Sequence, residues 1–499
     1  MRKLDTAADP KGNFIGGAWT PPTTGNYEPN TNPADQNDII GHYARSGAAD
    51  ANAAVSAAHA AFPAWAETPA PERGRVLARA AALIRSRIDV FATMLCREEG
   101  KTVVESRGEI MKGINLLEWY AGEGFRLGGK VVPSEMRKTL TFTTRHPVGV
   151  VALITPWNFP FAIPVWKSAP ALVAGCTVVM KPASLTPGTA ALLCEAYAEA
   201  GLPKGVMNLV TGPGGAVGNT LVDHPQVRAI SFTGSNEIGM ALAQRAAKRG
   251  VRVTCEMGGK NPVVVMDDAD LDLAASGILG GAFGSTGQRC TATSRVVVHA
   301  SVHDALVERI AGAARKLKVG NGQQAGIDMG PAVDQGQLKT DTDYIQIAQD
   351  EGAKLVCGGK RLDEGDLARG FYVEPTIFTG VTGKMRIAQE EVFGPVLSII
   401  KAEGFEQAVA LANDVEFGLA SSIYTRDANQ AMRFVEQSEV GMVHVNNPTV
   451  GGEAQLPFGG VKSTGLGARE MSEEGAEFFT EQKTVFWDYT GAARTSKIY

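Results

Sequence analysis

Cysteine is scarce and dispersed in this chain, with six residues among 499 and no CxxC pair. A disulfide scaffold needs closely spaced, paired cysteines, so this pattern excludes one and is typical of a reducing compartment. The seven histidines form no HExxH motif, and no GxSxG motif occurs. Zinc hydrolysis and serine-esterase chemistry therefore lose support. Most of the six thiols should be packing residues, which leaves room for one nucleophile.

Long apolar runs and a one-sided charge are also missing. No segment reaches the roughly 18 apolar residues of a membrane helix, and the N-terminal residues 1–16 lack the apolar core of a signal peptide. Forty-eight basic and 53 acidic residues leave a net charge of −5, which provides no field for holding nucleic acid or an anionic membrane. We expect a cytoplasmic protein whose partners include neither nucleic acid nor membrane.

What the sequence does contain is a globular chain, 44% hydrophobic and 20% charged, long enough for about three structural units. Residues 48–66 and 73–87 have the apolar spacing of amphipathic helices. From residue 147 onward, short β-branched runs closed by Gly or Pro alternate with Ala/Leu-rich segments. This alternation predicts an α/β fold with parallel sheets covered on both faces, and a second α/β unit after Gly258 and Gly259.

Two segments are predicted to form strands outside the two main α/β units. Residues 128–145 contain the alternating run KTLTFTTR, and the tail contains KTVFWDY at 483–489. A projecting hairpin and a C-terminal strand can pair sheets between subunits, so we expect a homo-oligomer, either a dimer or a tetramer.

Two glycine loops follow expected strands. Phe232–Gly239 precedes a helix, where backbone N–H groups can face a phosphate, but its G-x-x-x-x-G spacing also fits a simple turn. Gly212–Gly218 comes nearer to the dinucleotide fingerprint and leaves the same two interpretations open. Lys181 closes the strand TVVM, where a ligand contact and a solvated lysine are both plausible. Counted from Gly234, the fingerprint template would place Glu256 on a cofactor ribose.

Cys290 is the candidate nucleophile. It follows a Gly-rich segment and is flanked by Arg289 and small residues. A nearby cation and backbone donors favour the reactive thiolate, although a lone cysteine is more often a small buried residue. Cys255 is a rival because it precedes Glu256, but it lies inside the expected strand VRVTC.

Eight motifs, in order along essentially the whole chain, resemble those of the aldehyde dehydrogenase superfamily. They are GNFIGGAW (12–19), ITPWNFP (154–160), MKPAS (180–184), FTGSNEIG (232–239), EMGGKNP (256–262), GQRCTATSR (287–295), EEVFGPV (390–396) and PFGGVK (457–462). The resemblance implies two doubly wound parallel-sheet domains and a small β oligomerisation element. It assigns 1–127 and 146–258 to an NAD(P)-binding domain, 259–477 to a catalytic domain, and 128–145 with 478–499 to the oligomerisation element.

The resemblance also implies the catalytic roles. Cys290 would attack the aldehyde, and the oxyanion would be held by its own backbone N–H and by Asn158. Glu256 matches the general base that activates water to hydrolyse the resulting thioester, which replaces the ribose role suggested by the fingerprint template. Packing of Glu256 among apolar groups would raise its pKa and suit base catalysis near neutrality.

The implied cofactor is NAD or NADP, and no metal is expected. Lys181 and Ser184 resemble the pair that contacts the adenosine ribose. Many NAD-preferring members carry a glutamate where Ser184 stands, and that carboxylate would repel a 2′-phosphate, so a serine predicts that NADP is accepted. The remaining residues with implied cofactor contacts are Gly234 and Ser235 at the pyrophosphate, Glu391 and Phe393 at the nicotinamide ribose, and Thr155, Pro156 and Trp157.

The aldehyde tunnel is expected to include Phe159, Trp166 and Phe458, although each could simply be a core aromatic. Arg289 is the one cation that the sequence suggests for an anionic substrate, and a salt bridge or helix-end cap is the alternative. The motif set resembles most closely the members acting on α-ketoglutarate semialdehyde or related ω-carboxylated aldehydes.

Three other functions are alternatives for this sequence. One is a broad-specificity aliphatic or aromatic aldehyde dehydrogenase. Another is an acylating member that passes the thioester to coenzyme A, which the presence of Glu256 disfavours. The last is a catalytically silent structural relative, which would be expected to lose Cys290 or Glu256.

Overall fold

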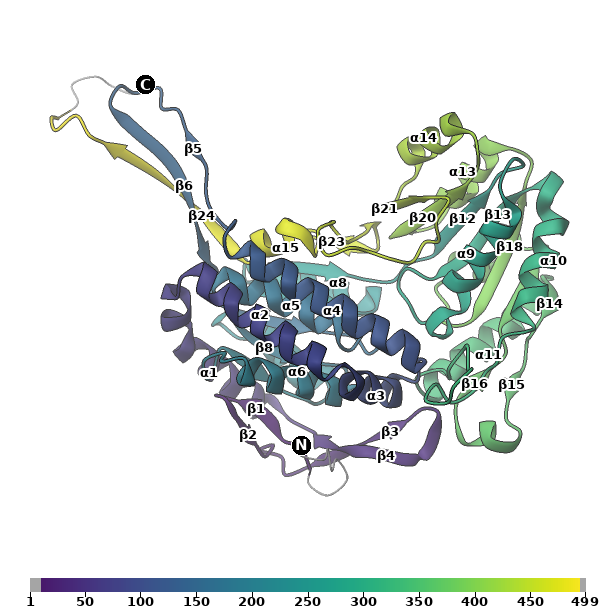
Figure 1. The fold of residues 1–499 in the computed structure, drawn as a ribbon, viewed down its shortest axis with the longest axis horizontal. Helices are drawn as coiled ribbons and strands as arrows, with labels where there is room; N and C mark the ends of the chain where they lie inside the picture. The colour runs from purple at the N-terminus through teal and green to yellow at the C-terminus, as the bar shows by residue number, and fades with distance from the viewer. Residues whose placement is uncertain (1–9, 494–499) are drawn as a thin grey trace.

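Two large sheets stand beside each other, and a narrow third sheet projects from the first (Figure 1). The computed structural model describes residues 10–493. The first sheet has the order β2-β1-β9-β8-β7-β10-β11-β23, parallel from β9 to β11 and antiparallel at its edges. Its strands are β1 (Asn13–Ile15), β2 (Ala18–Thr20), β7 (Val150–Ile154), β8 (Thr177–Lys181), β9 (Met207–Leu209), β10 (Val227–Thr233), β11 (Arg252–Glu256) and β23 (Gly465–Leu466).

Helices cover both faces of this sheet because successive strand residues point to opposite sides. On β7, Val151 and Leu153 enter one apolar core, and Val150, Ala152 and Ile154 enter the other. The first core is built mainly with α2 (Ala70–Ser86), α3 (Ile88–Glu99), α4 (Val103–Glu123), α5 (Ala162–Ala174) and α6 (Pro187–Glu199). The second is built mainly with α1 (Ala48–Glu67), α7 (Asn219–Asp223) and α8 (Asn236–Ala247).

The second sheet has the order β14-β17-β18-β13-β12-β20-β21, and all its pairs except β14 with β17 are parallel. Its strands are β12 (Asn261–Val265), β13 (Thr293–His299), β14 (Lys354–Cys357), β17 (Thr376–Thr379), β18 (Val396–Ala402), β20 (Ala420–Tyr424) and β21 (Met442–Val445). The chain passes from the first sheet to the second between Glu256 and Asn261, through Gly258 and Gly259. The two sheets confirm the α/β fold.

Helices also cover both faces of the second sheet. Val263 and Val265 of β12 pack with one set, and Val264 packs with the other. The helices are α9 (Leu271–Phe283) and α10 (His303–Ala314) on the first face, α13 (Phe405–Asn413) and α14 (Ala428–Gln437) on the second, and α11 (Gln335–Asp350) and α12 (Arg386–Gln389) around a further core.

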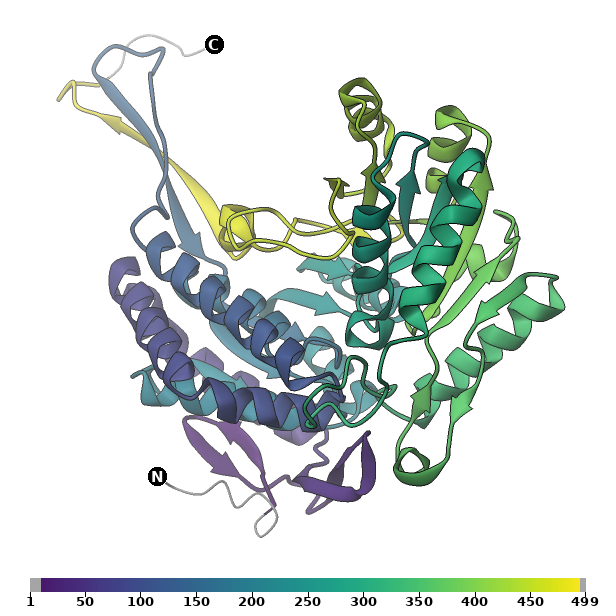
Figure 2. The same cartoon turned by 45° about the vertical axis from the view of Figure 1, so that its right-hand side comes forward.

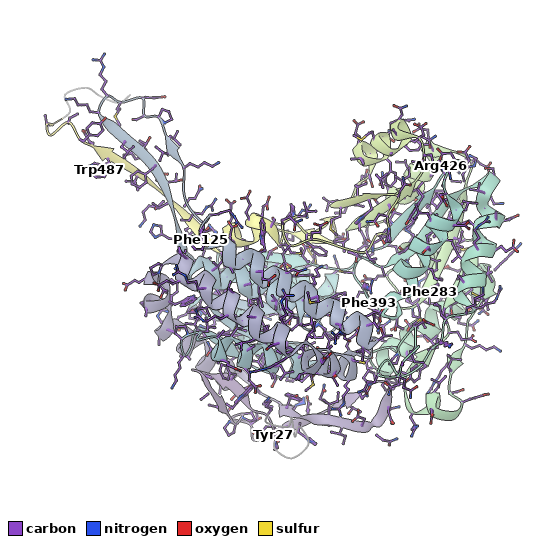
Figure 3. The ribbon with its side chains drawn as sticks, viewed as in Figure 1. Tyr27, Phe125, Phe283, Phe393, Arg426 and Trp487 are labelled. Carbon is purple, nitrogen blue, oxygen red and sulfur yellow. The ribbon has the colours of Figure 1, made fainter. Side chains whose placement is uncertain are left out.

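The projecting sheet consists of β5 (Val131–Val132), β6 (Thr139–Pro147) and β24 (Thr480–Asp488). β24 pairs antiparallel with β6 over its whole length, from Thr480 opposite Pro147 to Asp488 opposite Thr139. Hairpin and tail thus form one sheet within the chain, with β24 and β5 at its edges, and pairing of strands between subunits stays a prediction. Trp487 lies on this projection, well away from both large sheets (Figure 3).

A short C-terminal segment connects the two large sheets. β22 (Val461–Lys462) pairs with β19 (Phe417–Gly418), which directly precedes β20, and β23 pairs with β11. α15 (Ser472–Phe478) then packs on α5. Figure 2 shows this yellow segment running between the two units. The smaller pairs are β3 (Tyr27–Asn32) with β4 (Asp35–Ala44) and β15 (Arg361–Leu362) with β16 (Tyr372–Val373).

None of the helices within residues 10–493 combines the length and apolarity needed to cross a bilayer.

Candidate active site

Cys290 lies between α9 and β13, directly after a tight turn. Ser285 and Thr286 in that turn have φ values of 49° and 58°, which non-glycine residues rarely adopt. The turn is held from outside because Ser285 N–H donates to Glu105 Oε1 at 2.6 Å and Thr286 Oγ1 donates to Gly330 O at 3.0 Å. Asn261 Nδ2 donates to the carbonyl of Cys290 at 2.8 Å. The nucleophile's backbone is thus fixed from several elements.

The electrostatics of Cys290 correct the sequence-based expectation of a thiolate. Although part of the residue remains exposed, burial of its sulfur and the Glu391 carboxylate raise the pKa of the thiol to about 12. Arg289, the expected cation, instead donates to Ser285 Oγ from Nε and Nη2 at 3.1 and 3.0 Å. The side chain that opposes the rise is Lys112. Together these influences favour the protonated thiol over the thiolate.

Asn158 follows the carboxyl end of β7 and is buried beside the nucleophile. Its side-chain Nδ2 donates to the main-chain carbonyl of Gln288 at 3.1 Å. The main-chain carbonyl of Asn158 accepts from Lys101 Nζ at 2.7 Å. A primary amide has two donor hydrogens, so one remains for a further acceptor. Asn158 therefore has a donor hydrogen available close to the segment that leads to Cys290.

Glu256 ends β11, and its side chain is buried. Its Oε2 accepts from Gly460 N–H at 3.3 Å, in the loop that connects the two sheets. Burial, and then the neighbouring Glu470, hold the pKa of Glu256 well above its ordinary value. Glu256 in turn contributes to the raised pKa of Cys290, which places the two groups within electrostatic reach.

A buried polar cluster behind Glu256 was missed by the sequence analysis. Lys167 forms an ion pair with Glu470, and Ser231 Oγ donates to Glu470 Oε1 at 2.7 Å. Lys167 follows Trp166 in the sequence, yet nothing in its spacing relates it to Glu470, about three hundred positions later. Such a cluster becomes visible only when the fold brings α5, β10 and the C-terminal segment together.

Lys181 and Ser184 lie at the carboxyl end of β8. Lys181 is buried, and its Nζ donates to the carbonyl of Pro182 at 2.8 Å. Burial lowers the pKa of Lys181 to about 8, so its charged form lacks compensation from the protein. Ser184 is exposed and donates from Oγ to Gly212 O at 3.2 Å, which brings the glycine loop 212–218 to the same place. A polar ligand group fits here.

Gly234 and Ser235 lie between β10 and α8, with Ser235 at the helix N-cap. Gly234 N–H donates to the main-chain carbonyl of Glu256 at 3.1 Å. The N-terminus of α8 thus opens at the carboxyl edge of the first sheet, where open α/β folds bind nucleotides.

Glu391 and Phe393 approach the same edge from the second unit. Glu391 Oε1 accepts from Gly259 N–H at 2.8 Å, and burial raises the pKa of Glu391 to about 7. The Phe393 ring meets the Trp157 ring edge-on, with centroids 5.4 Å apart. Phe393 lies between the two large sheets (Figure 3). Nearby, Thr155 Oγ1 is buried without a hydrogen-bond partner among residues 10–493, an unsatisfied group that a bound ligand would complete.

A cavity of about 310 Å³ opens beside Cys290. Phe159, Trp166, Phe458 and Arg289, all expected from the sequence, line it. The sequence analysis missed four further charged residues of the lining, which are Lys101, Glu105, Glu109 and Lys112 of the α4 region. The spacing of 105, 109 and 112 places their side chains on one helix face. The sequence therefore shows that they share a face, but it does not show that this face lines the cavity.

These features combine a cysteine at the wall of a cavity, a buried carboxylate and two α/β units, a combination that suits an enzyme. The chain belongs to the aldehyde dehydrogenase family, which it matches over residues 19–485. It is an NAD(P)-dependent oxidoreductase acting on the aldehyde group of its substrate.

Three relatives show which members of the family the chain resembles. The chain is 46% identical to an alpha-ketoglutaric semialdehyde dehydrogenase of Bacillus subtilis, covering 95% of this chain and 97% of the relative. It is 40% identical to an NADP(+) succinate-semialdehyde dehydrogenase of Escherichia coli, covering 94% and 96%. A crystal structure of betaine aldehyde dehydrogenase from Staphylococcus aureus in complex with NAD+ superposes with a TM-score of 0.94 at 35% identity, covering 97% and 95%.

Proposed function

We propose that this aldehyde dehydrogenase oxidises α-ketoglutarate semialdehyde, or a closely related ω-carboxylated aldehyde, to the corresponding dicarboxylic acid. The observation that carries the proposal is the cavity beside Cys290, whose apolar walls include three cationic side chains, Lys101, Lys112 and Arg289. The Bacillus subtilis relative, whose name gives this substrate, supports it.

The first step is attack by Cys290 Sγ on the aldehyde carbon. The thiol first gives its proton to solvent water. The thiolate sulfur then forms the S–C bond, and the electron pair of the C=O π bond moves to the oxygen, which becomes the oxyanion of the thiohemiacetal. The remaining amide hydrogen of Asn158 and the backbone N–H of Cys290 supply the donors. Because they are fixed before the reaction, they stabilise the developing charge without reorganisation of the site.

The nicotinamide supplies the acceptor for the hydride that leaves the thiohemiacetal carbon. The residues proposed to hold it are Lys181 and Ser184 at the adenosine ribose, Gly234 and Ser235 at the pyrophosphate, Glu391 and Phe393 at the nicotinamide ribose, and Thr155, Pro156 and Trp157 at the carboxyl end of β7. The buried, uncompensated Lys181 ammonium and the unpartnered Thr155 hydroxyl fit such a ligand. With Ser184 in place of a carboxylate, we propose that NADP is accepted as well as NAD.

The second half-reaction is hydrolysis of the Cys290 thioester. Glu256 takes a proton from water, the hydroxide oxygen forms the new C–O bond, and the C–S bond breaks to release the acid and the Cys290 thiolate. A base with a raised pKa can take up this proton near neutrality. Hydrolysis by water distinguishes this mechanism from that of an acylating member, which would transfer the acyl group to coenzyme A.

We also propose the domain division expected from the sequence. Residues 1–127 and 146–258 would bind the cofactor, 259–477 would carry catalysis, and 128–145 with 478–499 would form the oligomerisation element. β23, which belongs to the catalytic range, nevertheless completes the first sheet.

The exposed apolar residues Phe486 and Trp487 on the projecting sheet support a homo-oligomer. Six free cysteines fit the reducing cytoplasm.

The deciding experiment is a kinetic panel with both cofactors. It compares α-ketoglutarate, succinate and glutarate semialdehydes with pentanal and benzaldehyde, following reduced nicotinamide. The proposal expects kcat/KM for an ω-carboxylated aldehyde to exceed that for pentanal by about tenfold or more. Preference for pentanal or benzaldehyde would favour the broad-specificity alternative, and absence of turnover with every aldehyde would favour a silent relative.

A further inference from the structure

The cavity beside Cys290 contains one cation that the protein leaves uncompensated. Lys112 lies on α4, one helical turn after Glu109, and it is partly buried. Among residues 10–493, its Nζ has no hydrogen bond or ion pair with another side chain. It lies instead over two aromatic rings, 5.1 Å from the centroid of Trp166 and 5.8 Å from that of Phe458. Aromatic faces attract an ammonium group but do not neutralise it.

The other two cations of the cavity are already paired. Lys101 Nζ donates to Glu109 Oε2 at 2.8 Å and to the carbonyl of Asn158 at 2.7 Å. Arg289 donates to Ser285 Oγ and has the Glu105 carboxylate 3.5 Å away. A substrate carboxylate at either position would have to displace an existing partner. At Lys112 it would meet an available charge.

Glu109 favours the charged form of Lys112 electrostatically but forms no ion pair with it among residues 10–493, although the two residues share a helix face. Glu109 Oε1 accepts from the N–H groups of Phe161 and Ala162 at 2.9 and 3.1 Å, and Oε2 is bound to Lys101. Both oxygens are therefore engaged by other donors. Burial lowers the pKa of Lys112, which is the direction expected for an ammonium that lacks its anionic partner.

A second unsatisfied donor belongs to the same wall. Trp166 is 3% exposed, and its indole Nε1 has no hydrogen-bond acceptor among residues 10–493. A buried N–H without an acceptor is costly unless a ligand or water completes it. Trp166 packs against Phe458 with ring centroids 5.1 Å apart, so the two rings and Lys112 form one unit.

We infer that Lys112 determines substrate specificity by pairing with the distal carboxylate of the aldehyde, while Trp166 and Phe458 hold its ammonium in the cavity. This inference rests on the proposed ω-carboxylated substrate. It assigns to Lys112 the role that the sequence analysis gave to Arg289, whose charge is already shared with Glu105.

The test measures kcat/KM for α-ketoglutarate semialdehyde and for pentanal in the full-length enzyme with saturating cofactor. Lys112→Met should lower the ratio of these two values by about 10- to 100-fold, mainly through KM for the semialdehyde, because a charge-assisted hydrogen bond is lost. Lys112→Arg should retain most of the ratio, since it retains the charge. Lys316→Met, at an exposed position on the second unit, is the matched control and should leave both values unchanged.

Inhibition by glutarate provides a readout that does not depend on turnover. Its competitive inhibition constant against the aldehyde should rise with Lys112→Met and be largely restored with Lys112→Arg. Thermal unfolding of each variant establishes that it is folded, and Lys112→Gln serves in place of the methionine variant if that one does not fold.

The possible failures can be told apart. If the unmodified enzyme does not prefer the semialdehyde to pentanal, the proposed substrate is wrong and the inference falls with it. If it does prefer the semialdehyde and Lys112→Met keeps that preference, only the inference is wrong. If Lys112→Met lowers kcat/KM equally for both aldehydes, the inference is also wrong, because Lys112 would then act on Cys290. The inference is wrong as well if Arg289→Gln loses the preference for the semialdehyde and Lys112→Met does not.

Discussion

Asn158 Nδ2 donates a hydrogen bond to the main-chain carbonyl of Gln288 at 3.1 Å. The bond connects the end of β7 in the first sheet to the turn that presents Cys290 from the second unit. It orients the amide and leaves its second hydrogen for a further acceptor, which we propose to be the substrate oxygen.

Replacing Asn158 with alanine should therefore lower kcat by about 10²- to 10³-fold, the typical cost of losing one oxyanion donor. Steady-state formation of reduced nicotinamide measures the effect. Asn115→Ala, at an exposed position on α4, is the control and should retain full activity. A loss below about threefold in Asn158→Ala would remove Asn158 from the oxyanion site.

The raised pKa of Cys290 predicts how fast the enzyme is alkylated without cofactor. Iodoacetamide reacts with the thiolate, so its rate at Cys290 should rise about tenfold per pH unit from 7 to 10 without levelling. An ordinary thiol would level off near its pKa of about 8.5. Peptide mass spectrometry distinguishes Cys290 from the partly exposed Cys357. A plateau below pH 9 would show that the site favours the thiolate.

Glu256 should govern the second half-reaction. Glu256→Gln is expected to retain a first burst of reduced nicotinamide and to lose steady-state turnover by about 10²- to 10⁴-fold. Stopped-flow absorbance resolves the two phases. Loss of the burst together with turnover would instead place Glu256 in the first half-reaction. Glu453→Gln, exposed at the rim, is the control.

The pH profile should show the influence of Glu470 on Glu256. A general base acts when deprotonated, so turnover should fall as the pH drops below the raised pKa of Glu256. Glu470→Gln removes a negative neighbour and leaves the positive Lys167, which lowers the pKa of Glu256. The acidic limb of the hydrolysis-limited rate should therefore move to lower pH. A limb that moves to higher pH would contradict this coupling.

Cofactor choice should depend on Ser184. Ser184→Glu places a carboxylate beside Lys181 and should lower kcat/KM for NADP by about tenfold or more, with a much smaller effect on NAD. Ser184→Ala, which adds no charge, should change neither by more than about threefold. An unmodified enzyme that already rejects NADP would contradict the reasoning.

The projecting sheet should control assembly. Phe486 and Trp487 are 68% and 61% exposed, an arrangement suited to burial against a second copy. The double variant Phe486→Lys, Trp487→Lys should have a smaller mass by light scattering than the unmodified protein. Gln482→Lys, on the same strand, is the control. A monomeric unmodified protein would refute the expected oligomer.

Much of the fold could be predicted because its signals are local. The β-branched runs ending in Lys181, Thr233 and Glu256 form strands β8, β10 and β11, each read from a few neighbouring residues. The pairing of β24 with β6 could not be predicted as internal, since alternating polarity does not specify which edge a strand joins.

Candidate site residues that belong to a sequence motif could be named from the sequence. Cys290 and Trp166 line one cavity, and Asn158 bonds to Gln288 shortly before Cys290, while their catalytic roles stay predictions. Lys112 and the pair Lys167–Glu470 were not found, because their significance depends on neighbours supplied by other elements and on which partners are already occupied.

The connecting segment between the sheets affects the order of events in folding. β11, which carries Glu256, acquires its last neighbour from β23, and Thr464 binds both the N–H of Met257 and, through Oγ1, the carbonyl of Gly258. These contacts span about two hundred residues of chain. A ribosome must therefore extend the chain beyond Leu466 before β11 and Glu256 acquire these contacts, which makes this part of the site late to form in the nascent chain.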